Sequence, residues 1–174
     1  MSESRPPFKI LFLCTGNSAR SVFGEFIMNF VGRDRFEAYS AGADPSGEVN
    51  PLTKKVLLER LKIDASDARS KSWDEFTDQG ITFDFLITVC DHAKETCPVW
   101  PGQPVIAHWS SPDPVDFEGT TEETEDFFYK VAMQIRRRVE LFCSFPLEKL
   151  DKHRLQQITS EIGEKEKMED PAVS

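Results

Sequence analysis

The stretch Phe8-Lys9-Ile10-Leu11-Phe12-Leu13 is an apolar run that ends abruptly at Cys14-Thr15-Gly16-Asn17-Ser18-Ala19-Arg20-Ser21. A nearly continuous run of Ile, Leu and Phe is typical of a strand buried on both faces of a parallel sheet. The residues from Ser21 to about Val31 predict a helix, with its apolar stripe at Val22, Phe26, Ile27 and Phe30. The chain therefore begins with a strand, a loop of small residues headed by a cysteine, and a helix.

Strands and helices continue to alternate along the chain. Further strands are predicted at about 35–40, 83–89 and 104–108, and a helix from Pro51 to about Lys62. The capping box Thr120-Thr-Glu-Glu123 opens a long helix to about Phe142, with a buried stripe at Phe128, Val131, Ile135, Val139 and Phe142. This alternation predicts a single α/β domain: a four-stranded open parallel sheet with helices on both faces. Ligands of such sheets bind at the carboxyl ends of the strands.

Beyond Pro146 the composition changes. Leu147, Leu150, Leu155, Ile158 and Ile162 fall near helical spacing among many charges, which predicts an amphipathic helix packed on the body or on a partner, without chemistry of its own. We therefore divide the chain into a domain over residues 1–145 and a charged helical extension over 146–174. The end of the extension, from Gly163 on, is polar and expected to be frayed.

The bulk composition narrows the class of function. The chain has 174 residues and a net charge of −9, which argues against nucleic acid or an anionic membrane as a partner. We expect neither a signal peptide nor a membrane span, and a cytoplasmic location. Four cysteines in a reducing compartment indicate catalysis, redox chemistry or metal binding more than structural bridges.

The loop at Cys14 has the residues of an oxyanion site. The small residues Gly16, Ser18 and Ala19 allow the backbone N–H groups of residues 15–20 to turn inward, and the following helix adds its N-terminal dipole. Arg20 offers a bidentate fork to two oxygens. The same positive surroundings predict a lowered pKa for Cys14, whose thiolate Ser18 and Ser21 would stabilise, while Asn17 braces the loop. A buried cysteine beside an ordinary surface arginine is the simpler alternative.

Cys14-Thr-Gly-Asn-Ser-Ala-Arg-Ser21 resembles the signature loop of low-molecular-weight phosphotyrosine phosphatases and of the arsenate reductases that share their fold. That family pairs its cysteine with an aspartate in a late Asp-Pro loop, which Asp113-Pro114 supplies here. The resemblance spans about residues 8–143 and implies that Thr15, Gly16, Asn17, Ser18, Ala19 and Arg20 bind the oxyanion. It also implies that Asp113 protonates the leaving oxygen. Read alone, Asp113 between two prolines is a turn former.

A second cysteine pair, Cys90 and Cys97, follows the third predicted strand. On a rigid helix, residues seven apart are separated by roughly 10 Å along the axis. A disulfide needs Cα atoms within about 7 Å, so a Cys90–Cys97 bond requires this segment to bend or unwind. That requirement suits a switch better than a structural bridge.

The spacing of this pair is similar to that of thioredoxin-coupled arsenate reductases. The resemblance implies that Cys14 attacks arsenate and that Cys90 attacks the adduct, releasing arsenite and leaving a Cys14–Cys90 disulfide. Cys97 would then form a Cys90–Cys97 disulfide that thioredoxin reduces. The implied partners are arsenate, with phosphate or sulfate as analogues, and thioredoxin as external reductant, with no bound cofactor or metal.

Other readings stay open at this stage. One is a phosphatase for phosphotyrosine or small phosphate esters, although Val115-Asp116 replace the aromatic residues that phosphatases place after Asp-Pro. Another is an arsenate reductase that uses glutathione with glutaredoxin or another small thiol. A third is a non-enzymatic metal-responsive protein. A zinc site could also be formed by Cys90, His92, Cys97 and His108, although their spacing matches no common zinc module. Cys143 is expected to be a packing residue.

The resemblance also concerns a potassium site found in some of these reductases. Asn17, Glu25 and Ser40 fit three of its four ligand positions, but Lys71 falls near the fourth. We expect the ammonium group of Lys71 to take the place of the ion.

Overall fold

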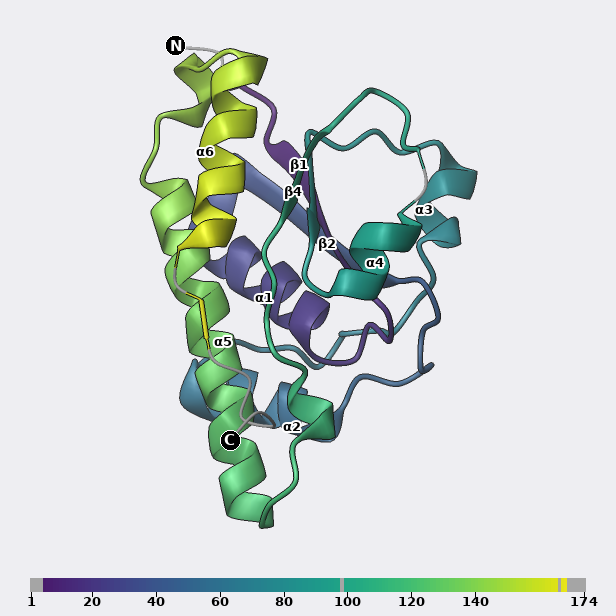
Figure 1. Cartoon of the computed structure of the whole chain (residues 1–174), viewed down its shortest axis with the longest axis vertical. Helices are drawn as coiled ribbons and strands as arrows, with labels where there is room; N and C mark the ends of the chain where they lie inside the picture. Colours follow the sequence, from purple (N-terminus) through teal and green to yellow (C-terminus); the bar gives the residue numbers. More distant parts are fainter. Residues whose placement is uncertain (1–4, 98, 166, 169–174) are drawn as a thin grey trace.

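The computed structural model describes residues 5–97, 99–165 and 167–168 and contains one sheet with the strand order β2-β1-β3-β4 (Figure 1). The strands are β1 (Phe8–Cys14), β2 (Phe36–Gly42), β3 (Phe85–Thr88) and β4 (Val105–His108). Every pairing in the sheet is parallel. The predicted four-stranded open parallel sheet is confirmed, and each strand lies within two residues of the position that its apolar run predicts.

Helices connect the strands and follow the sheet. They are α1 (Arg20–Gly32), α2 (Pro51–Lys55), α3 (Asp74–Gln79), α4 (Asp91–Thr96), α5 (Thr121–Cys143) and α6 (Lys152–Glu164). A π-helical segment (Val56–Arg60) continues α2, and 3-10 turns lie at Arg33–Arg35, Pro114–Asp116 and Leu147–Lys149. The predicted capping box forms at Thr120 and Glu123. The sequence does not reveal α3, because six residues are too few to show a helical period.

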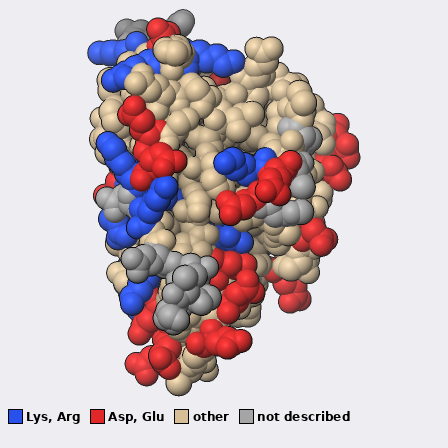
Figure 2. All heavy atoms as spheres, viewed as in Figure 1, with Lys and Arg blue, Asp and Glu red and all other residues tan. Residues whose placement is uncertain are grey.

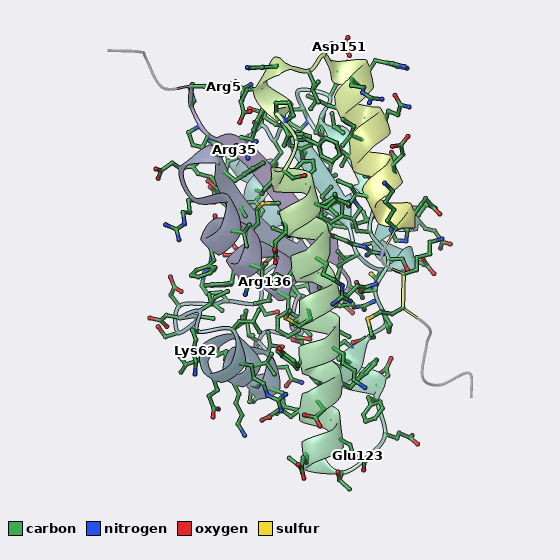
Figure 3. All side chains as sticks on the ribbon, turned by 90° about the vertical axis from the view of Figure 1, so that its left-hand side faces the viewer. Arg5, Arg35, Lys62, Glu123, Arg136 and Asp151 are labelled. Carbon is green, nitrogen blue, oxygen red and sulfur yellow. The ribbon has the colours of Figure 1, made fainter. Side chains whose placement is uncertain are left out.

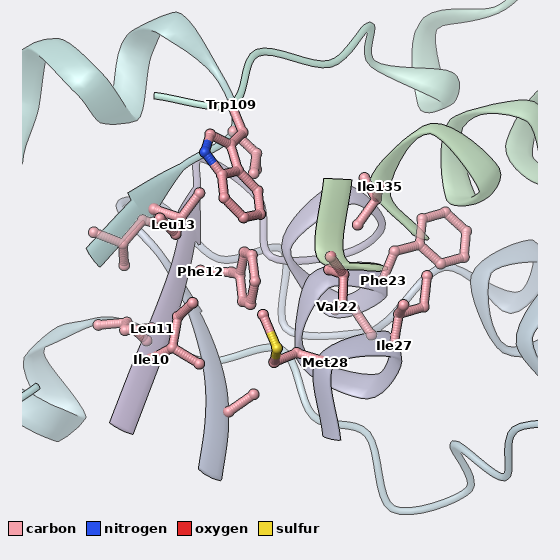
Figure 4. Close-up of a cluster of buried hydrophobic side chains, with 14 of the residues drawn as sticks. Ile10, Leu11, Phe12, Leu13, Val22, Phe23, Ile27, Met28, Trp109 and Ile135 are labelled. Carbon is pink, nitrogen blue, oxygen red and sulfur yellow. The ribbon is translucent and has the colours of Figure 1, made fainter. Parts of the chain in front are cut away.

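Helices α1 and α5 cover one face of the sheet. Phe12 of β1 lies between Trp109 and Met28 in the core (Figure 4), and a Cβ at Gly24 of α1 would meet the Phe12 ring at 2.6 Å. All five residues of the predicted α5 stripe are buried. The predicted α1 stripe is partly wrong: Val22 and Ile27 are buried, but Phe30 is 41% exposed, and Phe23 and Met28 are buried instead. Because α1 packs against both β1 and α5, its buried arc is displaced from the stripe that a single contact surface predicts.

An aromatic cluster covers the opposite face. Tyr39 of β2 makes edge-to-face contacts with Phe76 of α3 and with Phe83, and Phe83 contacts Trp100 in the same way. Such pairs contribute about 0.5–1.5 kcal/mol each beyond their buried area. Helices therefore lie on both faces of the sheet, as predicted.

The C-terminal helix α6 lies along the edge strand β4 (Figures 1 and 3). Its Gln156 side chain accepts a hydrogen bond from the N–H of Ile106 at 3.3 Å and donates one to the carbonyl of the same residue at 2.7 Å. The amide thus occupies backbone groups that an edge strand would leave free. Ile158 and Ile162 are buried, so the predicted packing of the extension on the body is confirmed.

The end of the extension is described only in part. Gly163 and Glu164 belong to α6, although the sequence predicts fraying from Gly163 onward. Residues 166 and 169–174 lie outside the described residues, and for them fraying stays a prediction.

Charge is distributed unevenly over the surface. On the face in Figure 2, Lys and Arg side chains gather at the upper end, where α6 begins, and Asp and Glu gather at the lower end, where α5 begins. The net charge of −9 repels an oxyanion, so local donors have to bind it.

Within the described ranges, no helix combines the length and apolar character that a membrane crossing requires.

Candidate active site

The loop from Cys14 to Arg20, here called the cradle, connects β1 to α1 and is held from its outer side. Four of its carbonyl groups accept hydrogen bonds from backbone N–H groups of the segment 43–50. The pairs are Cys14 with Ala43 (3.0 Å), Thr15 with Asp44 (2.9 Å), Gly16 with Ser46 (2.9 Å) and Ser18 with Asn50 (3.0 Å). In a trans peptide the C=O and the following N–H point in opposite directions. Outward carbonyls therefore turn the N–H groups of Thr15, Gly16, Asn17 and Ala19 inward, which is the backbone arrangement of an anion-binding nest.

Gly42 makes this close approach possible. It ends β2, pairs with Cys14 in the sheet, and any Cβ at this position would collide with the Thr15 carbonyl oxygen. The sequence marks Gly42 only as the end of a strand. Its role depends on a contact between two strands, which no local pattern shows.

The Cys14 sulfur accepts a backbone hydrogen bond from Asn17 at 3.1 Å and lies 2.9 Å from the Ser21 hydroxyl. Asn17 has a left-handed backbone, with φ of 47°, which turns its N–H back toward the sulfur. Its side-chain amide donates to Ser21 Oγ at 2.7 Å, which leaves the Ser21 hydrogen for the sulfur. Both the bracing by Asn17 and the contact of Ser21 with the thiol match the sequence prediction. The Ser18 hydroxyl makes no such contact among the described residues, so its role stays a prediction.

The pKa of Cys14 differs from the sequence expectation. Burial raises the pKa of this thiol and outweighs the lowering contributions of the Ser21 hydrogen bond, the Arg20 charge and the Asn17 N–H. The side chain is only 3% exposed, so a thiolate there loses most of its hydration. The sequence shows the positive neighbours but not the depth of burial, and its prediction of a lowered pKa is therefore wrong for the site as folded.

Arg20 connects the cradle to the loop that follows β4, here called the acid loop (residues 109–113). One terminal nitrogen of Arg20 donates to the Ser111 carbonyl at 3.1 Å, and the other lies 3.3 Å from an Asp113 carboxylate oxygen. The Asp113 side chain also accepts from the N–H of Val115, which fixes it at the start of a 3-10 turn. The structure thus brings together the arginine and the aspartate that the sequence singled out 93 positions apart.

Cys90 lies at the same edge of the sheet. It directly precedes α4, is buried, and its sulfur is 3.3 Å from the hydroxyl of Thr15, the residue after Cys14. It is near enough to Cys14 to raise that thiol's pKa. The second thiol therefore lies beside the cradle, as the position of Cys90 at the end of β3 predicts.

Cys97 ends α4, so the six-residue helix separates the two later cysteines. Burial raises the pKa of Cys97, and the hydrogen bond with the Trp100 side chain offsets this increase only in part. Cys97 lines a separate groove of about 650 Å³ together with Trp100, Ile106 and Glu164. A Cys90–Cys97 disulfide thus requires α4 to unwind, in agreement with the geometric argument from the sequence.

A cleft of about 380 Å³, here called the candidate substrate cleft, lies beside Cys90. It is lined by Arg20, Cys90, Asp113 and His108, by the acid loop, and by residues of α6 and the segment after it. The two ring nitrogens of His108 are used: Nδ1 lies 2.8 Å from Thr88 Oγ1 and Nε2 lies 3.0 Å from an Asp91 carboxylate oxygen. Among the described residues, no group of three or more His, Cys, Asp and Glu side chains could hold a metal ion. The side chain of His92, one member of the possible zinc site, lies outside the described residues.

Lys71 lies behind the cradle, where the sequence places it beside Asn17, Glu25 and Ser40. Its Nζ is 3.7 Å from Glu25 Oε1, and its backbone N–H donates to Asn17 Oδ1 at 2.9 Å. Ser40 donates to Glu25 at 2.6 Å and accepts from Asn17 at 3.0 Å. Burial lowers the pKa of Lys71 and raises that of Glu25, while each charge opposes the shift of the other.

Gln134 and Arg138 of α5 belong to the candidate site, although the sequence patterns do not indicate them. Both are fully buried and both hold the acid loop: Ser111 Oγ donates to Gln134 Oε1 at 2.7 Å, and Arg138 donates to the Ser110 carbonyl at 2.8 Å. The available signal is two polar residues four apart within an otherwise apolar helix face.

The model of the family described as low molecular weight phosphotyrosine protein phosphatase matches residues 9–157. The chain belongs to this family. An arsenate reductase from Halalkalibacterium halodurans is 38% identical over 135 residues, covering 77% of this chain and 94% of that protein. The arsenate reductase of Bacillus subtilis is 37% identical with the same coverage of both chains.

Solved structures agree with this assignment. An arsenate reductase from Archaeoglobus fulgidus shares 28% identity with a TM-score of 0.60, covering 78% of this chain and 99% of that one. A low molecular weight protein tyrosine phosphatase from T. tengcongensis shares 25% identity with a TM-score of 0.63, covering 82% and 99%. The fold thus serves both activities, and the site residues must distinguish them.

Proposed function

We propose that this protein reduces arsenate to arsenite with Cys14, Cys90 and Cys97 in succession and that thioredoxin regenerates it. The observation that carries the proposal is the position of Cys90, whose sulfur lies 3.3 Å from the Thr15 hydroxyl beside the cradle. A phosphatase needs the cradle, Arg20 and Asp113, but it has no use for a second thiol at this place. The relatives named arsenate reductase support the same choice.

The first step forms a bond between Cys14 and arsenic. The inward N–H groups of the cradle and the Arg20 guanidinium bind the oxyanion. The Cys14 thiolate attacks As(V), and Asp113 gives a proton to the departing oxygen, which leaves as water. Since burial raises the pKa of Cys14, the Ser21 hydroxyl and the Asn17 N–H have to stabilise the thiolate as it forms.

The second step is the reduction. The Cys90 thiolate attacks the Cys14 sulfur, the sulfur–arsenic electron pair moves to arsenic, and As(III) leaves as arsenite. A Cys14–Cys90 disulfide remains. Two electrons have passed from two thiolates to arsenic, so the step balances.

The third step resets the site. The Cys97 thiolate attacks Cys90, frees Cys14 and leaves a Cys90–Cys97 disulfide, for which α4 must unwind. Cys97 borders a groove that also includes Val99, which is 99% exposed. A dithiol protein such as thioredoxin could therefore approach the disulfide from this side without entering the substrate cleft.

The deciding experiment is arsenate-dependent oxidation of NADPH in the presence of thioredoxin and thioredoxin reductase. We expect turnover for the wild type, none for Cys14→Ser or Cys90→Ser, and unchanged turnover for Cys143→Ser. Cys143 is the matched control because it is partly buried, its sulfur lies 3.9 Å from that of Met28, and burial raises its pKa to about 11. Hydrolysis of p-nitrophenyl phosphate by both wild type and Cys90→Ser, without arsenate turnover, would show that the protein is a phosphatase.

A further inference from the structure

The acid loop is held by a part of the chain that the family model covers only in part. That model ends at residue 157, within α6. The later turns of α6 contact the acid loop directly: Trp109 Nε1 donates to the Thr159 carbonyl at 2.9 Å. A Cβ at Gly163 would collide with the His108 carbonyl oxygen, so α6 can reach the loop this closely only with glycine there.

Arg138 connects the same two parts from the side of α5. Its side chain is fully buried, and its guanidinium donates to the Ser110 carbonyl at 2.8 Å and to the Gly163 carbonyl at 3.3 Å. Its Nε donates to the Lys165 carbonyl at 3.3 Å. The carbonyl of Gly163 is one of the last four of α6, which have no partner inside the helix and favour a positive charge. One guanidinium thus caps α6 and holds the acid loop.

The held peptide leads directly to the catalytic groups. Ser111, the next residue, accepts from Arg20 through its carbonyl at 3.1 Å and donates from its hydroxyl to Gln134 at 2.7 Å. Arg20 in turn lies 3.3 Å from Asp113. A shift of the Ser110–Ser111 peptide would therefore move both the oxyanion-binding arginine and the acid.

We propose that Arg138 is a positioning residue for the acid loop and that α6 holds the same loop from its other side. Arg138 and α6 together are here called the clamp, and through it the C-terminal extension contributes to the active site. Burying a guanidinium is expensive, and a packing role alone would be served by an apolar side chain of similar volume. Arg138 instead joins three carbonyls from two segments. The end of α6 and the segment after it also form one wall of the substrate cleft, through Gly163, Glu164 and Lys167.

The first test replaces Arg138 with methionine and uses Arg136→Met as the control. Arg136 is on the same helix, but it pairs with Glu140 at the surface. For each variant, the rate of arsenate-driven Cys14–Cys90 disulfide formation is measured in a single turnover. The rate is divided by the amount of reactive Cys14, so that unfolded protein does not count. We expect a loss of roughly tenfold to a hundredfold for Arg138→Met, because small displacements of catalytic groups are costly, and none for Arg136→Met.

A double-mutant cycle with Asp113→Asn shows whether the effect passes through the acid loop. If Arg138 positions Asp113, Arg138→Met should cost much less in the Asp113→Asn protein than in the wild type. Equal losses in both backgrounds, or an unchanged rate per reactive Cys14, would overturn the proposal. Arg138→Lys, which keeps the charge but not the three-way fork, should recover the rate only in part.

Gly163→Ala tests the other half of the clamp and covers the case in which Arg138→Met does not fold. Alanine favours helix formation, so a loss of rate would come from the collision with His108 and not from a weaker helix. Glu161→Ala, on the exposed face of α6, is the control. A rate for Gly163→Ala equal to that of Glu161→Ala would contradict a role for α6.

The inference rests on the proposed function only because the tests above use arsenate-driven disulfide formation as their readout. Protection of Cys14 from iodoacetamide by inorganic phosphate measures oxyanion binding without any arsenate chemistry. We expect Arg138→Met to need a several-fold higher phosphate concentration for half-protection, because Arg20 loses its anchor. If the wild type is protected by phosphate but does not react with arsenate, the proposed function fails, and this readout still decides the role of Arg138.

Discussion

The cradle and the segment from Cys90 to Cys97, here called the relay segment, both carry thiols of the proposed mechanism, but they are built in opposite ways. Four cradle carbonyls are bonded to the neighbouring segment 43–50, and Asn17 alone makes contacts with Ser21, Ser40 and the backbone of Lys71. The relay segment is a six-residue helix, α4, with one cysteine at each end. It is followed by Val99, whose side chain is 99% exposed.

This difference matches what the proposed mechanism requires of each thiol. Oxyanion binding depends on donors that are already in place, since donors that must first reorganise lose much of their effect. Thiol exchange requires contact between the sulfur atoms of Cys90 and Cys97, which α4 holds apart. The relay segment must therefore be able to unwind. The cradle follows β1 and the relay segment follows β3, and these neighbouring strands end at the same edge of the sheet.

Cys97→Ser separates the two regions most sharply. We expect steady-state turnover with thioredoxin to fall by at least about a hundredfold, because no thiol remains in the relay segment to attack Cys90 and release Cys14. A single turnover should still proceed at the wild-type rate, and mass spectrometry should find a Cys14–Cys90 disulfide. A slow single turnover would show that Cys97 also serves the cradle, and the comparison would fail.

Ser21→Ala tests whether the bonding of the cradle sets the reactivity of Cys14. Removing a hydrogen bond that lowers the pKa raises it further, so less thiolate is present at neutral pH. We expect alkylation of Cys14 at pH 7 to slow by about tenfold, the equivalent of one pKa unit. The rate should continue to increase with pH beyond the range in which an ordinary thiol is already titrated. Ser144→Ala, at the surface end of α5, is the control, and equal pH profiles for the two variants would contradict the argument.

Glu95→Gly probes the opening of the relay segment. Glycine destabilises the helical, reduced form of α4 by about 1 kcal/mol relative to alanine. For a two-electron couple this makes the Cys90–Cys97 disulfide harder to reduce by about 20 mV. The potential is measured by equilibration with dithiothreitol, with Glu95→Ala as the matched control. An unchanged potential would mean that the disulfide forms without unwinding α4.

The smallest expected effect concerns potassium. If the Lys71 ammonium takes the place of an ion beside Glu25, activity and melting temperature should be equal in potassium and sodium chloride. Lys71→Met should be less stable, because the buried Glu25 carboxylate loses its neighbouring positive charge. Without that charge, the pKa of Glu25 is raised further by burial. A response of the wild type to potassium but not to sodium would refute this role of Lys71.

Local sequence patterns were enough to predict the order and type of the main elements, and they named the candidate site residues. The apolar run before Cys14, the small residues of the cradle, Arg20 and Asp113 are local patterns, and each depends on a few neighbours along the chain. A parallel sheet then brings the carboxyl ends of its strands together, which is why the sequence predicts Cys14 and Cys90 at one edge.

Contacts between distant segments exist only in the folded chain, and no local pattern predicts them. The fold places the 43–50 segment behind the cradle and brings Gly42 so close to Thr15 that a Cβ would collide with its carbonyl oxygen. It also holds the acid loop with Gln134 and Arg138. It also reversed the expected pKa shift of Cys14, because desolvation depends on the whole surrounding core and not on the residues next in sequence. The position of α6 also depends on such contacts: its amphipathic pattern predicts that it packs, but only the fold shows that it packs on the acid loop.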